Sequence, residues 1–226
     1  MNVDGSVSVV IPAFNAARFL PDAVGSVRRQ SSVIRELIVV DDGSDDNTFD
    51  VAQKLGATTL KLTNGGAGRA RRAGLALVSS SYVLFLDADD RLHTNALESL
   101  RDAAEAASAH IVSGRLVNIL DEEFSSTMPN AGAPYAGPLA TATLIRRAAF
   151  ELVGPFNDDN VSWLRWIAAA KRRELAMHSI DAVVADRRIH SANVSRTALV
   201  DGSYFDVLRK HVHSLRTNPP ATVRES

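Results

Sequence analysis

The 226-residue sequence contains no cysteine, which excludes disulfide bonds and thiolate metal sites. It also lacks any apolar stretch near the ~20 residues that a membrane-spanning helix requires. No basic start precedes the N-terminal apolar run, which breaks at Pro12, so the pattern is not that of a secretory signal. The formal net charge of −1 gives no reason to expect nucleic acid or an anionic membrane as a partner. We therefore expect a soluble, cytoplasmic protein without a transmembrane segment.

The first half of the chain alternates apolar runs with helical patterns, which is typical of βαβ units and a mostly parallel sheet. The second half is less regular, and the shift near residue 109 indicates a change of role within one domain rather than a linker. We predict a single α/β domain over residues 1–226, with helices flanking the sheet and a frayed C-terminal tail. The predicted strands cover residues 7–12, 36–41, 58–63, 82–87, 110–120 and 180–188, and the predicted helices cover residues 16–30, 46–55, 67–79, 94–107 and 161–173.

Polar residues mark two of the predicted helix starts and the longest predicted loop. The side chains of residues 44–46 (Ser-Asp-Asp) are suited to cap the second helix, and Thr94 or Asn95 is suited to cap the fourth. Residues 121–138 are acidic at first and then rich in Ala, Gly and Pro, which indicates an exposed loop.

Two of the predicted strands end in acidic residues. Asp41 and Asp42 follow "ELIVV", whereas Asp87, Asp89 and Asp90 belong to the end of "YVLFLDADD". In an open parallel sheet the ligand crevice lies outside the carboxyl ends of the strands, so both clusters are expected at one edge. Two carboxylates ~4 Å apart repel by roughly 4 kcal/mol at an effective dielectric of about 20, and they need protons, hydrogen-bond donors or a cation. Oxygen ligands favour Mg²⁺ or Mn²⁺, and ordinary polar turns are the alternative.

The stretch "NGGAGRARRAGLAL" places glycines immediately before a predicted helix that carries Arg69, Arg71 and Arg72 in its first turns. Free backbone N–H groups and guanidinium groups in this position suit a phosphate. The stretch is not a P-loop, because no GKS or GKT follows, and Arg71 stands where the dinucleotide fingerprint has its third glycine. A flexible loop followed by a solvated basic helix face would explain the same residues.

Four segments together resemble a known family. The segments "VSVVIPAFNAARFLPDAVGSVRRQ", "ELIVVDDGSDDNT", "GGAGRARRAGLALVSSSYVLFLDADD" and "VGPFN" occur in the order and spacing found in the family 2 glycosyltransferases. The resemblance is dense over residues 6–107 and thin afterwards. It implies a GT-A fold in which residues 6–109 bind a nucleotide-sugar donor and residues 110–226 form the acceptor side. It also implies an inverting glycosyltransferase that uses a nucleotide-diphosphate sugar, usually a UDP-sugar, and a divalent cation, Mn²⁺ or Mg²⁺.

The resemblance implies donor-site roles for individual residues. Asp87 and Asp89 match the family's D-x-D motif, in which the first acid approaches the ribose and the second binds the metal. Arg71 matches an arginine that lies near the diphosphate. The residues that match the nucleobase contacts are Pro12, Ala13, Phe14, Asn15, Asp41 and Asp42.

The sequence departs from the family where a general base is expected. Relatives carry acidic residues just before a tryptophan-containing helix, but Val161 and Ser162 occupy those places here. Asp158 and Asp159 stand a few residues earlier and are the candidate bases, although two solvated aspartates in a surface turn are the alternative. Without a base, the chain would be a nucleotide-sugar binding module that has lost catalysis.

The last part of the sequence leaves two further alternatives open. The segment "DRRIHSANVS" resembles the family's R-x-H, which implies that His190 binds the metal or the diphosphate, whereas an ordinary loop histidine fits equally well. Trp163 and Trp166 lie three residues apart on one helix face, where they suit either the core or a sugar-stacking platform. No motif identifies the sugar, the oligomeric state or the acceptor, which could be a glycan, a lipid, a peptide or a small molecule.

Overall fold

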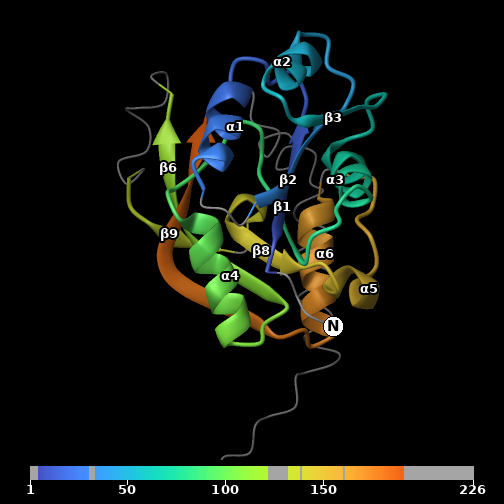
Figure 1. The fold of residues 1–226 in the computed structure, drawn as a ribbon. Helices are drawn as coiled ribbons and strands as arrows, with labels where there is room; N and C mark the ends of the chain where they lie inside the picture. The colour runs from blue at the N-terminus through green and yellow to red at the C-terminus, as the bar shows by residue number, and fades with distance from the viewer. Residues whose placement is uncertain (1–4, 31–33, 122–131, 138, 160, 191–226) are drawn as a thin grey trace, which may run out of the picture. The chain divides into compact units, whose positions relative to one another are not determined.

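The first half of the chain alternates strands with helices, as the sequence predicts (Figure 1). In the computed structural model the described residues are 5–30, 34–121, 132–137, 139–159 and 161–190. Parallel neighbours need a crossover connection, and the helices between these strands supply it. The elements of the first half are β1 (Val7–Ala13), α1 (Leu20–Arg28), β2 (Ile34–Asp41), α2 (Thr48–Lys54), β3 (Thr58–Lys61), α3 (Ala67–Leu75) and β4 (Tyr82–Phe85).

The second half contains shorter elements and one long strand that returns to the sheet. This strand, β9, pairs with β6 along most of its length. The elements are β5 (Arg91–Leu92), α4 (Ala96–Ala106), β6 (Ile111–Leu120), β7 (Tyr135–Ala136), the 3₁₀ turn η2 (Ala140–Ala142), β8 (Thr143–Arg146), α5 (Ala149–Val153), α6 (Ser162–Arg172) and β9 (Met177–Ile189).

The nine strands within the described residues form one sheet in the order β3-β2-β1-β4-β8-β6-β9-β5, with β7 paired to β6. The pairings among β1, β2, β3 and β4 are all parallel. β8 runs antiparallel to both β4 and β6, and β5 runs antiparallel to β9. The predicted α/β class is therefore confirmed; the parallel arrangement describes the first four strands, and the sheet as a whole is mixed.

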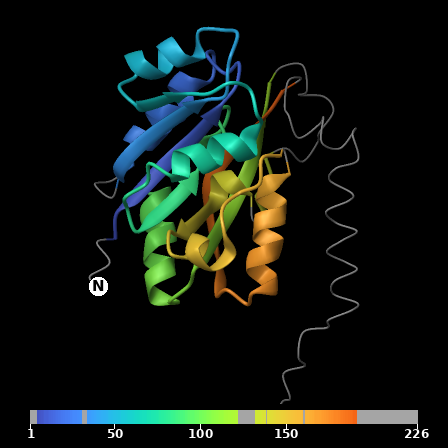
Figure 2. The same ribbon diagram turned by 90° about the vertical axis from the view of Figure 1, so that its right-hand side faces the viewer.

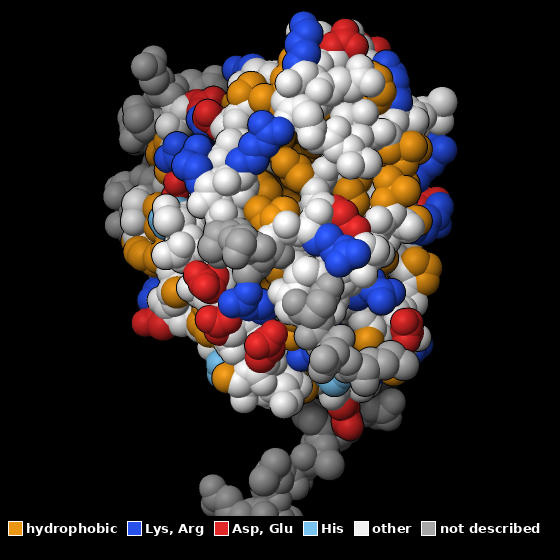
Figure 3. Space-filling view, in the orientation of Figure 1, with side chains coloured by type: hydrophobic (Ala, Val, Ile, Leu, Met, Phe, Trp, Pro, Cys, Tyr) orange, Lys and Arg blue, Asp and Glu red, His pale blue; other side chains and the backbone are white. Residues whose placement is uncertain are grey.

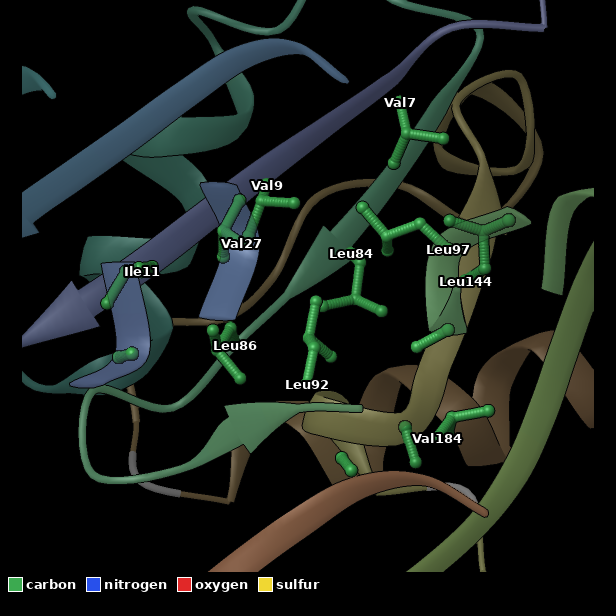
Figure 4. Close-up of a cluster of buried hydrophobic side chains, with 14 of the residues drawn as sticks. Val7, Val9, Ile11, Val27, Leu84, Leu86, Leu92, Leu97, Leu144 and Val184 are labelled. Carbon is green, nitrogen blue, oxygen red and sulfur yellow. The ribbon is translucent and has the colours of Figure 1, made fainter. Parts of the chain in front are cut away.

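Two groups of helices cover the two faces of the sheet (Figures 1 and 2). Side chains of α1, α2 and α4 join Val7, Val9 and Ile11 in one buried cluster, part of which Figure 4 shows. Side chains of α3, α5 and α6 join Val10 in a second cluster. β1 is apolar at nearly every position because both of its faces are buried, and each fully buried valine or isoleucine contributes about 1.5–3 kcal/mol.

Trp163 and Trp166 belong to the second cluster. Their exposed fractions are 5% and 3%, and the Trp166 ring lies 4.5 Å from the Phe150 ring, centroid to centroid. The Trp163 ring is stacked 6.1 Å from that of Phe156, and Trp166 Nε1 donates a hydrogen bond to the Gly154 carbonyl at 2.8 Å. Both tryptophans are therefore core residues rather than a sugar-stacking platform.

Some boundaries differ from the predicted ones. β4 ends at Phe85, so Asp87 lies in the turn after the strand rather than in the ladder. β9 begins at Met177, three residues before the predicted start. β5 and β7 were not predicted, because two-residue strands are too short to carry a hydrophobic period. β7 lies within the predicted loop at residues 121–138.

The predicted helix caps are present in part. Asp46 Oδ1 accepts a hydrogen bond from the backbone N–H of Thr48 at 2.9 Å, at the start of α2. Asn95 precedes α4 but has a left-handed backbone, with φ of 61°, and its side chain makes no capping hydrogen bond. Its backbone conformation rather than its amide therefore marks the helix start.

The rest of the sequence predictions for loops and tails lie outside the described residues. These are residues 122–131 of the predicted loop and the predicted frayed tail beyond residue 190. Among the residues that the structure describes, no helix is long and apolar enough to cross a membrane. Acidic and basic side chains are interspersed on the face shown in Figure 3, in keeping with the small net charge.

Candidate functional site

The candidate site lies at the carboxyl ends of β1, β2 and β4. In the sheet register Ala13 pairs with Asp41, and Val10 pairs with Phe85, so the three strands end at the same edge. Asp41 is the last residue of β2 and Asp42 follows it directly, while residues 87–90 form the turn after β4. The two acidic clusters of the sequence therefore meet at one edge, as expected from the direction of parallel strands.

Asp41 stabilises the turn that follows β2. It is 1% exposed, and its Oδ1 accepts hydrogen bonds from the Ser44 backbone N–H at 3.1 Å and from the Ser44 hydroxyl. Its Oδ2 has no hydrogen-bond donor among the described residues, and Lys61 Nζ lies 4.0 Å away. Because side chains alternate along a strand, Asp41 shares its face with Val39, on the side that α1 and α2 cover.

Asp42 holds the glycine loop. Its carboxylate accepts the backbone N–H groups of Gly65 at 3.1 and 3.2 Å and of Gly66 at 2.6 Å. Gly43 has φ of 79°, and a Cβ there would lie 2.6 Å from the Asn64 backbone nitrogen, so glycine is required for this close approach. The N–H groups of Gly65 and Gly66, which the sequence suggested were free for a phosphate, are bonded to Asp42.

The segment after β1 joins the same edge. Asn15 has φ of 50°, and its Oδ1 accepts a hydrogen bond from the Asp45 N–H at 2.9 Å. Its own N–H donates to the Ser44 hydroxyl at 2.9 Å, which ties the end of β1 to the loop after β2. Phe14 exposes 43% of its surface here, whereas Pro12 is partly buried. The predicted base-lining residues therefore present one exposed aromatic ring beside a fixed polar turn.

Arg71 and Asp87 form an ion pair at this edge. Arg71 Nη2 donates to Asp87 Oδ1 at 2.9 Å. Arg71 is only 6% exposed, while the Asp87 side chain is 44% exposed. Arg71 of α3 thus places a buried positive charge next to Asp87, the first acid of the D-x-D, and the Asp87 side chain remains accessible to solvent.

Asp89 faces His190, which follows β9. The Asp89 Oδ2 and His190 Nε2 atoms lie 2.9 Å apart, and the Phe19 ring packs on the imidazole with centroids 4.6 Å apart. Burial raises the pKa of the Asp89 carboxyl, and the nearby Asp87 carboxylate raises it further. The structure therefore brings together the two predicted metal ligands, which are 101 residues apart in sequence.

Asp90 is the buried member of the acidic turn. Its Oδ2 accepts the Thr141 hydroxyl at 2.6 Å, and its Oδ1 accepts the Arg188 backbone N–H at 2.9 Å. Burial and the negative charges of Asp89 and Asp87 raise its pKa well above the ordinary value for an aspartate. Asp90 points away from solvent, at 3% exposure, and ties the turn to two other parts of the chain.

Asp158 and Asp159 are both paired with arginines. Arg72 Nη2 donates to Asp158 Oδ2 at 2.8 Å, and the Arg165 Nε atom lies 3.1 Å from Asp159 Oδ2. Asp159 Oδ1 also accepts the Val161 backbone N–H at 3.0 Å, which places it at the start of α6. The two candidate bases therefore lie between α3 and α6, next to the helix that carries Arg71.

Comparison with known proteins decides the family. Residues 8–158 match the model of the family described as Glycosyl transferase family 2. The chain belongs to glycosyl transferase family 2.

Curated relatives of this family 2 chain are longer than the chain itself. An uncharacterized glycosyltransferase of Nostoc sp., alr2836, is 30% identical over an alignment of 182 residues, and the match covers 71% of this chain and 56% of the relative. The poly(ribitol-phosphate) β-N-acetylglucosaminyltransferase TarP of Staphylococcus aureus is 37% identical over an alignment of 117 residues, and the match covers 48% of this chain and 36% of TarP. The family 2 chain thus spans about half or less of the length of these two relatives.

Solved structures confirm the GT-A fold. Residues 1–349 of S. aureus TarS, in complex with UDP-GlcNAc, align with a TM-score of 0.71 and 19% identity over 93% of this chain and 66% of that one. The mannosyltransferase PcManGT of Pyrobaculum calidifontis, in complex with GDP-Man and Mn²⁺, aligns with a TM-score of 0.71 and 15% identity over 95% of this chain and 65% of that one. At 19% and 15% identity, these structures show the fold of the family 2 chain and nothing beyond it.

The residues at the edge fit a divalent cation of the kind this fold uses. Asp89 and His190 offer one carboxylate and one imidazole, and the repulsion that raises the pKa of Asp89 is one that a cation would relieve. Among the described residues no group of three His, Asp or Glu side chains is arranged to hold a metal. Mg²⁺ and related ions are commonly bound by one or two carboxylates together with substrate phosphates, so two protein ligands suffice.

Three contributors to the candidate site were not found from the sequence. Thr141, whose hydroxyl bonds Asp90, lies in a stretch without any motif. Phe19, whose ring packs on His190, stands just before a helix, where an apolar residue gives no sign of a site. The Arg188 N–H is a backbone group, which no side-chain pattern reveals. Of these, only Arg188 was indicated by the sequence, because it belongs to the R-x-H segment at residues 188–190.

Proposed function

We propose that this chain is an inverting glycosyltransferase that moves a sugar from a UDP-sugar to an acceptor hydroxyl, with Mn²⁺ or Mg²⁺. The observation that carries the proposal is the meeting of Arg71, Asp87, Asp89 and His190 at the sheet edge. The complexes of TarS with UDP-GlcNAc and of PcManGT with GDP-Man and Mn²⁺ support a nucleotide-sugar donor.

The proposed donor site uses residues at the ends of four strands, β1, β2, β4 and β9, together with Arg71 of α3. Asp87 would bind the ribose, and the buried guanidinium of Arg71 would carry positive charge toward the diphosphate. Asp89 and His190 would hold the cation, which, when bound, neutralises charge on the leaving nucleoside diphosphate. The nucleobase end of the site would be formed by Pro12, Ala13, Phe14, Asn15, Asp41 and Asp42.

The proposed reaction is a single displacement at the anomeric carbon. The acceptor oxygen forms a bond to that carbon while the bond to the diphosphate oxygen breaks, which inverts the centre. The proton of the acceptor hydroxyl passes to a carboxylate on the far side, for which Asp158 and Asp159 are the candidates. Both lie between α3 and α6, near the helix that carries Arg71.

A donor screen tests the proposal. UDP-glucose, UDP-galactose, UDP-GlcNAc and GDP-mannose are each added with Mn²⁺ or with EDTA, and the melting temperature Tm is measured. A UDP-sugar at 100 times its Kd should stabilise the protein by about 2.7 kcal/mol, and only with Mn²⁺. For a domain of about 200 residues this corresponds to a rise in Tm of roughly 5–10 °C. Binding that is equally strong in EDTA contradicts the metal role, and preference for GDP-mannose contradicts the UDP assignment.

The candidate bases are tested separately. If Asp158 or Asp159 is the base, its replacement by Asn should lower transfer by roughly 10²–10⁴-fold while donor binding is retained. Arg72→Gln and Arg165→Gln are the matched controls, because each breaks the same ion pair and leaves the carboxylate in place. Full transfer by both Asn variants would remove these residues from the mechanism.

Two observations favour a non-catalytic role. Both candidate bases are paired with arginines, and Val161 and Ser162 stand where relatives carry acids. A nucleotide-sugar binding module would bind the donor with Mn²⁺ and transfer nothing to any acceptor. Slow hydrolysis of the bound donor to free sugar, measured by release of UDP, distinguishes an enzyme from such a module without knowledge of the acceptor.

A further inference from the structure

The acidic turn at residues 87–90 is held by a backbone hydrogen bond within the turn and by the side chain of Thr141. The Asp90 N–H donates to the Asp87 carbonyl at 3.0 Å. Thr141, in η2, contacts both ends of the same turn. Its Oγ1 lies 3.3 Å from the Asp87 backbone nitrogen and 2.6 Å from Asp90 Oδ2.

The chemistry of a hydroxyl fixes the direction of both bonds. A threonine hydroxyl has one proton to donate and lone pairs that accept. The Asp90 carboxylate accepts the proton, so a lone pair of the same oxygen receives the Asp87 N–H. Serine can make both bonds at this position, whereas valine, which has the same shape as threonine, can make neither.

The Thr141 contacts are buried, so water cannot replace the hydrogen bonds if the hydroxyl is removed. Thr141 is 1% exposed and Asp90 is 3% exposed. The second oxygen of Asp90 accepts the Arg188 N–H at 2.9 Å, so the carboxylate is held from η2 on one side and from β9 on the other. Removing the hydroxyl would leave the Asp87 N–H and Asp90 Oδ2 without this hydrogen bond, and the loss of a partner by a buried polar group is unfavourable.

The position of the turn determines where the D-x-D side chains lie. Asp87 begins the turn and meets Arg71, while Asp89 stands immediately before Asp90 and meets His190. A turn that is no longer fixed at both ends would let these two carboxylates separate from their partners. Thr141 itself is buried and lies behind the turn, so it acts on the site through Asp87 and Asp90.

We propose that Thr141 is a positioning residue, whose hydroxyl fixes the 87–90 turn so that Asp87 and Asp89 can hold the donor and its cation. This inference rests on the proposed function for the role of the two aspartates. The structural role of Thr141, in which its hydroxyl orders the turn, follows from its hydrogen bonds and does not depend on the proposed function.

The test compares Thr141→Val, which removes the hydroxyl, with Thr141→Ser, which keeps it. The matched control is Thr143→Val, two residues further on. Thr143 is also buried, at 0% exposure, and its hydroxyl donates to the Leu139 carbonyl at 2.7 Å and lies 3.1 Å from Ser113 Oγ; neither contact involves residues 87–90. Both valine variants lose a buried hydroxyl, so a general loss of stability affects them alike. Thr141→Ala replaces Thr141→Val if the valine variant does not fold.

The first measurement needs no ligand. Hydrogen–deuterium exchange is followed by mass spectrometry on a peptide that covers residues 86–92. Thr141→Val should speed exchange in this peptide, whereas Thr141→Ser and Thr143→Val should leave it as in the unmodified protein. Equal exchange in all four proteins would overturn the proposal, whatever the chain binds.

The second measurement is the Mn²⁺ concentration for half-maximal binding of the UDP-sugar found in the screen. Losing a group that hydrogen-bonds a metal ligand typically costs about 10–100-fold in metal affinity. Thr141 bonds the neighbours of Asp89 rather than Asp89 itself, so we expect a rise near the lower end, about 10-fold, for Thr141→Val alone. An unchanged Mn²⁺ requirement in Thr141→Val would overturn the proposal. If the unmodified protein binds no nucleotide sugar, the proposed function fails, and the exchange experiment still decides the role of Thr141.

Discussion

Replacing Asp89 with Asn should abolish the metal dependence of donor binding. The substitution keeps the size of the side chain and an oxygen that can face His190, but it removes the negative charge that would hold the cation. We expect the affinity for the UDP-sugar in Mn²⁺ to fall by roughly 100-fold or more, since even an outer-shell partner of a metal ligand contributes up to about 100-fold. Isothermal titration calorimetry with and without Mn²⁺ measures the effect.

A control variant separates the role of Asp89 from a general effect of charge. Asp50→Asn changes the net charge by the same amount at an exposed position in the first turn of α2. It should bind the donor like the unmodified protein, with the same requirement for Mn²⁺. If Asp89→Asn also behaves in this way, Asp89 does not hold the metal.

Gly68→Ala should destabilise the protein, although the substitution places a better helix former in α3. In an unobstructed helix, alanine is favoured over glycine by about 1 kcal/mol. Here a Cβ on Gly68 would overlap the Asn157 carbonyl oxygen and lie 2.7 Å from both the Asp159 carbonyl oxygen and Ser162 Oγ. Two of these atoms are backbone atoms and cannot rotate away, so overpacking of about 1–3 kcal/mol should exceed the gain in helix propensity.

The sign of the Gly68 effect is read from unfolding by urea or heat. The loop that contains Asp158 and Asp159 packs on α3 at this point, so we also expect transfer activity to fall. Gly132→Ala is the control, because no atom of the described residues, apart from its chain neighbours, lies within 4 Å of a Cβ at that position. An alanine variant at 68 that is as stable as the unmodified protein would show that the loop moves aside at little cost.

The sequence predicts the first half of the fold well because its signals are local. The strands β1, β2 and β4 are apolar runs, and α3 follows a glycine-rich turn that is plain in the sequence. Parallel strand direction then brings the carboxylates of Asp41 and Asp87 to one edge without further information. The gathering of the acids was therefore predictable from patterns no longer than about a dozen residues each.

The remaining features depend on contacts that no local pattern encodes. Asp42 is bonded to the backbone of Gly65 and Gly66, and every residue presents the same N–H whatever its side chain. The Thr141 hydroxyl reaches the turn after β4 only because β8 is inserted antiparallel beside that strand. The arginine partners of Asp158 and Asp159 likewise come from packing between helices, so the sequence could propose these acids as bases but could not show that they are paired.

The contacts of β9 also have a consequence for how the site forms during folding. The family match ends at residue 158, yet Asp89 and Asp90 are held by His190 and by the Arg188 N–H. These contacts join residues 101 and 98 positions apart, so a long loop must close before either can form. Contacts of such high sequence separation slow folding, whereas the β1–α1–β2 unit is local. The acidic turn therefore gains its final geometry late, and a chain shortened to the matched residues would keep the D-x-D while lacking the strand that fixes it.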